Sequence, residues 1–472
     1  MLFNSFEFLW LFPIIFCVYH LMSWRKMGNV SLLLISYGLY IKWKPVSALI
    51  LLWVTVITYL TARLLDLRGG KTEKQDKLLL LIGIILTLSP LIVFKYLNFI
   101  NVSIADGLSL LGIHVGIMGL NWVLPIGLSF FTLQAIGYLY DVYKRQVEVE
   151  NNWWDYMLFV SFFPQIASGP ISKAKDLLPQ IKAQRTFNYG QAVQGLKWIL
   201  WGMFMKVVMA DRVGIYADTI FNNYEHLSGL SCFMGSLLYT LQIYGDFAGY
   251  SFMAVGVGEL LGFELVNNFR RPYLSQSITE FWHRWHISLS TWLKDYIYIP
   301  LGGSHCSKAR NYWNILVTFL VSGLWHGANW TFIVWGGLHG VFQIIEKMMK
   351  LQRPTSMGIT KVVRIIVTFL LVNFAWVFFR MPTLNDAIEM ISRMIINHDI
   401  TIAEITPAMA LFIIMSVFIV VLKDFMDEFC NRKHTMFHHQ NVIIRWSVYI
   451  VMVGMILTCG VFDASQFIYV NF

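Results

Sequence analysis

Charged side chains are scarce in this sequence of 472 residues. Asp, Glu, Lys and Arg make up 13% of it, whereas 57% of the residues are hydrophobic. A soluble domain carries about 25% charged residues, so this chain has too few to cover a surface that faces water. Apolar runs of about 20 residues, enough to cross ~30 Å of hydrocarbon as a helix, recur from end to end. The short alternating segments of a transmembrane β-barrel are lacking. The sequence therefore predicts an all-α, polytopic integral membrane protein.

Other features are also lacking. The five cysteines include no Cys-x-x-Cys pair, which argues against a disulfide framework and against a metal knuckle. The first apolar segment has no basic region before it and no small-residue cleavage site after it, so we expect a retained span. No internal repeat of the kind found in many secondary transporters is visible.

The formal net charge is +9, yet the sequence does not indicate a protein that binds nucleic acid. The basic residues occur in short connections between apolar segments, which is the positive-inside pattern of membrane proteins. Four of these connections are candidates for the cytoplasmic side: 63–77, 143–152, 173–185 and 347–364.

We predict one membrane domain over residues 1–472, with roughly eleven transmembrane helices and additional re-entrant or interfacial helices. The segment 311–350 is long enough for two helices. The hydrophobic segments are 5–24, 28–42, 46–64, 78–98, 120–140, 153–171, 192–222, 229–263, 311–350, 361–380, 408–426 and 441–460.

The region 267–310 differs from its apolar neighbours because it combines charged residues and histidines with many aromatic residues. Ser277 and Glu280 have the spacing of a capping box, which predicts that a helix starts there. Such a segment is too polar to span and suits a helix that lies at an interface or lines a cavity. On helical spacing it has two neighbouring stripes, one of Phe281, Trp285, Ser288 and Trp292 and one of His283, His286 and Ser290.

The stretch VSGLWHGANW, residues 321–330, places His326 in a run that otherwise has the composition of a membrane segment. Ionisable residues inside a membrane are costly and by default mark a functional site. His339 follows 13 residues later, about 3.6 turns, and so returns toward the same side if Asn329 interrupts the helix little. Small residues flank His326 and allow close helix packing or close approach of the backbone to a substrate: Gly323, Gly327 and Ala328.

Three kinds of chemistry could use these histidines. A metal site could combine His283 and His286 with His326, but few carboxylates are near and we predict no metal. A proton relay in a transporter is a second reading, because imidazole titrates near neutral pH. General-base catalysis is a third, because apolar walls keep an imidazole neutral and able to accept a proton. Composition alone does not choose between the last two.

The sequence EFWHRWHISLSTWLKDYIYIPLGGS (280–304), followed by SGLWHGANWTFIVWGGLHG (322–340), resembles the membrane-bound O-acyltransferase (MBOAT) superfamily. More closely, it resembles the bacterial branch that contains the membrane subunit of alginate O-acetyltransferase. That branch is related to the D-alanine-exporting acyltransferase of teichoic acid synthesis. Further segments match in the same order, so the resemblance covers nearly the whole chain.

The resemblance implies helices that tilt around a central funnel through the membrane, with the catalytic motifs in 267–340. It places the catalytic histidine on His326 and the second family histidine on His286. It also implies a bacterial inner-membrane enzyme that moves an acetyl group from a cytoplasmic thioester, such as acetyl-CoA, to an extracellular or periplasmic polysaccharide. No bound cofactor is expected. The expected partner is a secreted or membrane-anchored SGNH-hydrolase-like protein that completes the transfer.

Further side chains are expected to line the funnel or contact the substrate: Trp285, Trp325, His283, Arg284, Asp295, His339 and Asn329. We expect Asp295 to pair with a nearby base rather than to catalyse. Basic side chains that could attract a phosphate-bearing donor, or alternatively pair with lipid phosphate, are Arg271, Arg284, Lys294 and Lys308.

Two positions depart from the pattern of the branch. His283 stands where arginine is expected, and Gly245 stands where an aromatic residue is usual. Two alternative functions stay open on the sequence alone. One is a proton-coupled transporter or flippase of a lipid-linked sugar, and the other is an O-acyltransferase that modifies lipids.

Overall fold

The computed structural model describes residues 3–22, 25–68, 72–114, 123–166, 168–356 and 358–462, together with residues 116, 119 and 468. Helices make up all the regular secondary structure of these residues, and no strand occurs among them. The predicted all-α class is therefore confirmed. The single domain over 1–472 stays a prediction.

The first half of the chain forms mostly long helices with two short breaks. The helices are α1 (Phe6–Leu21), α2 (Arg25–Trp43), α3 (Pro45–Arg68), α4 (Glu73–Leu91), α5 (Leu97–Ser109), α6 (Leu128–Tyr143), α7 (Trp153–Ser161), α8 (Phe163–Ile166), α9 (Ala174–Lys182), α10 (Tyr189–Met203) and α11 (Asp211–Asn222). Wider π-helical turns join α4 to α5 and α10 to α11, namely η1 (Ile92–Tyr96) and η2 (Phe204–Ala210).

The second half places short helices between long ones. Its helices are α12 (Gly229–Leu260), α13 (Ile278–Arg284), α14 (Ile287–Leu293), α15 (Lys308–His326), α16 (Trp330–Met348), α17 (Gly358–Arg380), α18 (Leu384–Ile396), α19 (Pro407–Phe429) and α20 (Val442–Cys459). The π-helical turn η5 (Lys294–Tyr298) follows α14. Single 3₁₀ turns are η3 (Tyr224–His226), η4 (Pro272–Leu274), η6 (Arg432–His434) and η7 (Met436–His438).

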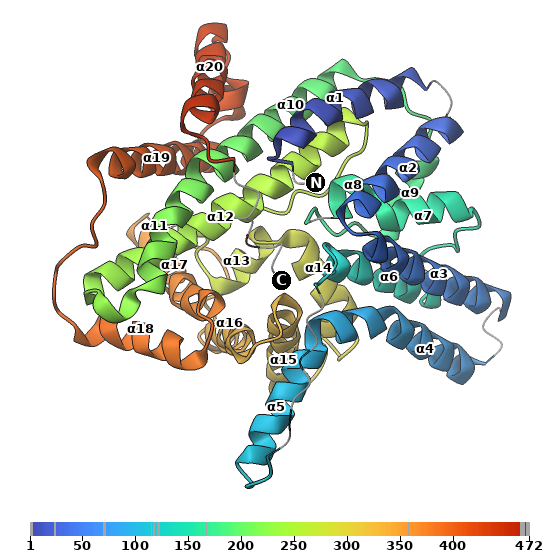
Figure 1. Ribbon diagram of the computed structural model, residues 1–472, viewed down its shortest axis with the longest axis horizontal. Helices are drawn as coiled ribbons and strands as arrows, with labels where there is room; N and C mark the ends of the chain where they lie inside the picture. The colour runs from blue at the N-terminus through green and yellow to red at the C-terminus, as the bar shows by residue number, and fades with distance from the viewer. Residues whose placement is uncertain are drawn as a thin grey trace.

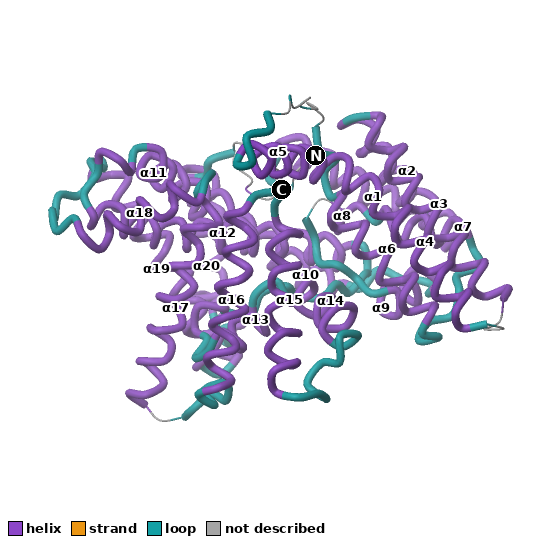
Figure 2. Tube along the Cα trace, turned by 90° about the horizontal axis from the view of Figure 1, so that it is seen from below, coloured by secondary structure: helices purple, strands orange, loops and turns teal. Residues whose placement is uncertain are grey.

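The short helices α13 and α14 lie near the centre of the view in Figure 1, and longer helices surround them there. Helices α10 and α12 lie on one side, α3, α4 and α6 on a second, and α15, α16 and α17 on a third. In Figure 2 the loop before α15 and the start of α17 reach the lower edge, whereas α5 and both chain termini lie in the upper part. The short helices of the polar 267–310 region thus lie among apolar helices, whereas its loop before α15 is mostly exposed.

Five helices among the described residues are long and apolar enough to cross a membrane, by length and composition. They are Pro45–Leu67, Glu73–Ser109, Gly358–Arg380, Pro407–Phe429 and Val442–Cys459. All five overlap segments that we predict as spans. The total of roughly eleven spans is not confirmed and stays a prediction.

Two predicted segments differ from the structure in their continuity. The segment 153–171 is interrupted after Ser161, because Pro164 has no N–H to continue the helix. The N–H of Phe163 donates instead to the Ser36 hydroxyl, 3.2 Å away. The segment 311–350 contains two helices, as its length suggested.

Helices α10 and α12 approach each other closely through glycine. A Cβ atom on Gly202 would lie 2.4 Å from the carbonyl oxygen of Gly249, and a Cβ atom on Gly249 would lie 2.7 Å from that of Gly202. Neither position therefore has room for a side chain. Small residues that let backbones meet are a common basis of helix packing in membranes.

The contact between α12 and η2 explains why Gly245 departs from the family pattern. A Cβ atom at Gly245 would lie 3.0 Å from the carbonyl oxygen of Met205 and 3.0 Å from Cβ of Ala210, so a side chain there would crowd η2. The same contact buries an ammonium between two carboxylates, because Lys206 lies 2.5 Å from Asp211 and 2.6 Å from Asp246. Buried charges persist when they are paired in this way.

We predict that Gly202→Ala lowers the thermal stability of the protein, because one methyl group forces α10 and α12 apart. The matched control is Gly38→Ala, since a Cβ atom at that helical glycine meets no atom within 4 Å. The measurement is the temperature at which the detergent-purified protein loses its monodisperse gel-filtration peak. Equal temperatures for the two variants would show that the glycine contact does not stabilise the fold.

Candidate functional site

The predicted helix start at Ser277 is confirmed. The Ser277 hydroxyl accepts a hydrogen bond from the N–H of Glu280 at 3.0 Å, and the Glu280 carboxylate accepts one from the N–H of Gln276 at 2.8 Å. Glu346 on α16 holds the same end of the helix, since its carboxylate accepts from the N–H groups of Ile278 and Thr279. Helix α13 is thus fixed to α16 at its first turn.

The continuous stripes that we predict across this region are wrong, because the helix breaks between α13 and α14. Helix α13 ends at Arg284, Trp285 is extended, and His286 adopts a left-handed conformation with φ of 43°. For a residue other than glycine this conformation costs roughly 1–2 kcal/mol, so other contacts must hold it in place.

Asn268, which lies 20 residues before Ser288, provides those contacts. Its backbone carbonyl accepts from the N–H of Ile287 at 3.0 Å, and its side-chain oxygen accepts from the N–H of Ser288 at 3.0 Å. Nearby, the N–H of Arg270 donates to the carbonyl of Arg284 at 2.9 Å. Together these bonds cap α14 and force the turn at His286.

The spacing argument for His339 is also wrong, because α15 ends at His326 and a new helix, α16, begins after Asn329. The side chain of Asn329 caps α16 by accepting from the N–H of Thr331, and it donates to the carbonyl of Pro382 at 2.7 Å. Helices α15 and α16 therefore form an antiparallel hairpin. His326 and His339 come together across this hairpin, with the Trp335 ring 4.9 Å from one imidazole and 5.0 Å from the other.

Glycine allows this hairpin to close tightly, as the small residues around His326 predict. A Cβ atom on Gly323 would lie 2.2 Å from the carbonyl oxygen of Phe332, and one on Gly336 would lie 2.3 Å from that of Phe319. The two helices touch at backbone level one turn before His326. The position of His326 relative to α16 is thus set by backbone contact.

Three histidines, His286, His326 and His339, form a buried group that we call the histidine cluster. Their side chains are 0%, 1% and 0% exposed. The ring centroids of His286 and His326 lie 6.5 Å apart. The ring of Trp325 lies 4.8 Å from that of His326 and 5.9 Å from that of His286.

Hydrogen bonding distinguishes the members of the cluster. The indole N–H of Trp282 donates to Nδ1 of His339 at 3.3 Å, so neutral His339 carries its proton on Nε2. His286 has no hydrogen-bond partner for either ring nitrogen among the described residues. Buried polar atoms are normally paired, so an unpaired imidazole in an aromatic enclosure is a candidate for contact with a substrate.

The other predicted site residues have different surroundings. Trp285 is fully buried and packs on Trp376, with ring centroids 5.1 Å apart. Asp295 forms an ion pair with Lys173, as expected for a structural carboxylate. Among the described residues no group of three or more His, Cys, Asp or Glu side chains has the arrangement of a metal site.

Arg284 and Arg271 are held by acidic side chains. Arg284 forms a bidentate ion pair with Glu428, with distances of 2.9 and 3.1 Å, and a second ion pair with Glu280 at 2.6 Å. Arg271 lies 2.6 Å from Glu428. Burial lowers the pKa of Arg284, but the two carboxylates outweigh burial and hold that pKa above its ordinary value. These contacts join α13 to the end of α19 and occupy the guanidinium groups that we expected to attract a donor.

A pocket of about 370 Å³ lies between α13, α14, α15 and α16. Its lining includes three basic side chains, His283, Lys294 and Lys347. Trp282 and Ile287 also line it. Because Trp282 contacts His339 and Ile287 follows His286 directly, this part of the pocket lining is one side chain away from the histidine cluster.

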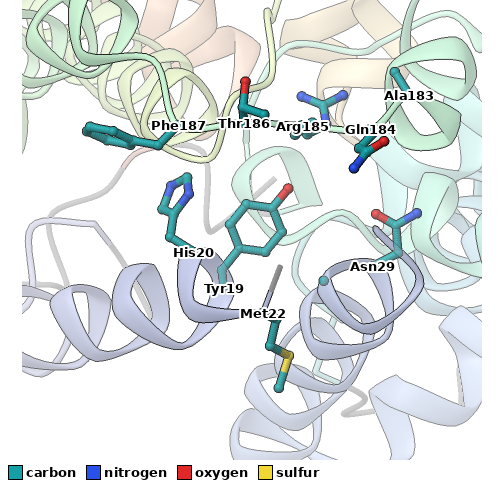
Figure 3. A pocket seen from close by; sticks show the side chains of 10 residues that line it. Tyr19, His20, Met22, Asn29, Ala183, Gln184, Arg185, Thr186 and Phe187 are labelled. Atoms are coloured by element: carbon teal, nitrogen blue, oxygen red, sulfur yellow. The ribbon is translucent and has the colours of Figure 1, made fainter. Parts of the chain in front are cut away.

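A second pocket, of about 270 Å³, lies between the end of α1 and the 183–187 segment. Figure 3 shows Tyr19 and His20 on one side of it and Gln184 and Arg185 on the other. The guanidinium of Arg185 donates to the carbonyls of Gly262 and Gln180, so it fastens a loop. This pocket shares no lining residue with the pocket beside the cluster.

Sequence reasoning missed Lys95, which lies in η1 beside the cluster. Its ammonium donates to the carbonyl oxygen of Trp325 at 2.5 Å and to the Ser129 hydroxyl at 3.4 Å. The signal was present, because a lysine in the middle of a long apolar segment marks a site by the same rule that singled out His326.

We predict that Arg284 and Glu428 are energetically coupled. Single and double alanine variants should give melting temperatures that are non-additive, because either single change leaves a half-buried charge with only one of its two partners. The control cycle is Arg393 with Glu389, a 3.3 Å pair on one helix that is more exposed and should couple weakly. Additive melting temperatures for the first pair would contradict the assignment.

Comparisons with known proteins agree with this geometry. The model of the membrane-bound O-acyltransferase (MBOAT) family matches residues 35–384, which include the whole histidine cluster. A probable alginate O-acetylase of Pseudomonas syringae pv. tomato is 39% identical over 409 residues, which cover 86% of this chain and 78% of that protein. A peptidoglycan O-acetyltransferase of Helicobacter pylori is 34% identical over 440 residues, which cover 86% of this chain and 82% of that protein.

A teichoic acid D-alanyltransferase of Streptococcus thermophilus is 30% identical over 235 residues, which cover 47% of this chain and 56% of that protein. The match therefore extends to a more distant group of proteins, whose name states D-alanyl and not acetyl as the transferred unit. Taken with the apolar helices, these comparisons show that the chain belongs to the membrane-bound O-acyltransferase family and is a multi-pass membrane acyltransferase.

Proposed function

We propose that this protein moves an acetyl group from a thioester donor on the cytoplasmic side, such as acetyl-CoA, across the membrane for O-acetylation of an extracellular or periplasmic polysaccharide. The observation that carries the proposal is the meeting of His286 and His326 in one aromatic enclosure, one side chain away from the lining of a basic pocket. The names of two relatives support the acetyl group and a polysaccharide acceptor, since one is an alginate and the other a peptidoglycan O-acetyl-transferring protein.

The proposed chemistry is acyl transfer by general-base catalysis at His326. The imidazole takes the proton of an acceptor hydroxyl while the hydroxyl oxygen attacks the thioester carbonyl carbon. The tetrahedral intermediate then collapses, the carbon–sulfur bond breaks, and the imidazolium returns its proton to the leaving thiolate. The products are an O-acetyl ester and a free thiol. Holding donor and acceptor together in the dry enclosure supplies much of the rate.

The basic pocket is the proposed entry for the donor. Lys294 and Lys347 suit the phosphates of a coenzyme A thioester, because ammonium groups form charge-assisted hydrogen bonds with phosphate oxygens. Positive charge also favours the cytoplasmic side for this face, since the connection 347–364 next to the pocket contains five basic residues, Lys347, Lys350, Arg353, Lys361 and Arg364. A bacterial inner membrane, with acetyl-CoA on this side, fits the arrangement.

The proposed acceptor hydroxyl belongs either to the polysaccharide or to an SGNH-hydrolase-like partner that passes the acetyl group on. Membership of an acyltransferase family argues against the transporter and flippase alternative. A lipid O-acyltransferase is distinguished by its product. With acetyl-labelled donor, the label should appear in the surface polysaccharide fraction, and label recovered in membrane lipid instead would favour lipid acylation.

We predict that His326→Ala lowers acetyl transfer by about 100-fold or more, the usual size of a general-base contribution. The matched control is His305→Ala, because that histidine lies exposed in the loop before α15 and should leave transfer near the wild-type rate. Both variants must first give the wild-type gel-filtration profile. Wild-type acetylation of the surface polysaccharide by folded His326→Ala would exclude His326 as the base.

We predict that Lys294→Gln and Lys347→Gln each raise the donor KM about tenfold, since each loses a charge-assisted contact worth roughly 1.5 kcal/mol. The control is Lys350→Gln, which removes an exposed charge near the pocket but outside its lining. The measurement is the dependence of initial rate on acetyl-CoA concentration in proteoliposomes. Equal KM values for all three variants would show that the donor does not use this pocket.

A further inference from the structure

Lys95 lies in the middle of the 37-residue helical run Glu73–Ser109, the most apolar of the five candidate membrane spans. No carboxylate of the described residues forms an ion pair with it. A lysine at the centre of a membrane helix costs roughly 3 kcal/mol, so a lysine without a carboxylate partner in this apolar run marks a candidate site.

The ammonium is directed at the end of α15. Trp325, whose carbonyl oxygen accepts the 2.5 Å hydrogen bond from Lys95, is joined by that same peptide group to His326. The next residue, Tyr96, donates its hydroxyl to the carbonyl of Leu324 at 2.8 Å. The last carbonyls of a helix lack partners within the helix, and two consecutive residues of the α4–α5 run supply them here.

The two donors are not equivalent. The neutral hydroxyl of Tyr96 satisfies its carbonyl, which shows that capping this turn does not require a charge. The positive charge of Lys95 also attracts the negative, C-terminal end of the α15 dipole. It also lies 5.8 Å from the centre of the Trp325 ring, which itself contacts His326 and His286. The positive charge thus sits against the enclosure of the two histidines.

We propose that Lys95 is a positioning residue for acyl transfer that fixes the turn carrying His326 and supplies an uncompensated positive charge beside the reacting groups. This inference rests on the proposed function. When the acceptor oxygen attacks the thioester, negative charge develops on the carbonyl oxygen. A positive charge beside the reacting groups stabilises that charge more in the low-dielectric interior of a protein than it would in solution. The π-helical turn η1 sets Lys95 at the height of the last turn of α15.

The test compares four variants in the acetyl-transfer assay. Lys95→Met removes both the bond and the charge, and Lys95→Gln keeps a donor for the Trp325 carbonyl without the charge. Lys95→Arg keeps the charge, and Tyr96→Phe removes the neighbouring cap alone. We expect the Met and Gln variants to lower kcat about 100-fold with little change in the donor KM. The Arg variant should recover at least a tenth of the wild-type kcat, and Tyr96→Phe should stay within about threefold.

Other outcomes overturn the inference. If Tyr96→Phe lowers kcat as much as the Lys95 variants, the two residues only cap the helix. A wild-type kcat for Lys95→Gln or Lys95→Met removes any role for the charge, and if Lys95→Met fails to fold, Lys95→Gln decides alone. Wild-type protein and His326→Ala are run beside them. A wild-type protein without transfer activity, or an active His326→Ala, refutes the proposed function, whereas failure of the Lys95 variants alone refutes only this inference.

Discussion

The site depends on the backbone contact between α15 and α16. Gly323 and Gly336 let the two helices cross with no side chain between them, and the crossing sets His326, Trp335 and His339 against one another. Helix α16 then extends the arrangement, because Glu346 binds the first turn of α13 and so places the segment that carries His286. Any widening of the hairpin would therefore move all three histidines.

Strain and burial at His286 follow from this arrangement. The residue is left-handed, fully buried and without a hydrogen-bond partner among the described residues, three costs that a packing histidine would not need to bear. Asn268 holds the chain just after His286, and the ion pairs of Arg284 hold the chain just before it. The favourable contacts of the neighbouring residues thus offset the unfavourable backbone conformation of His286. Functional sites in proteins are usually arranged in this way.

Local signals in the sequence predicted the all-α class, the start of α13 at Ser277 and the close packing around His326. They failed where distant residues decide the structure. Helical periodicity in the sequence continues through Trp285 and His286, and it predicted no break there. The break is caused by Asn268, which lies in a separate segment that has no periodic pattern. His339 was expected near His326 by helical spacing, but the hairpin at Asn329 brings the two residues together instead. Lys95 was missed because its apolar neighbours made the whole segment look like an ordinary span.

The proposed function requires that an acyl thioester reach the histidine cluster through the pocket lined by Lys294 and Lys347. The most direct measurement is a cryo-electron microscopy structure of the protein with a non-hydrolysable thioether analogue of acetyl-CoA. We expect the phosphates to lie beside these lysines and the acetyl carbon to lie within about 4 Å of the His326 ring. An analogue bound elsewhere, or one whose acetyl group ends away from His326 and His286, would contradict it.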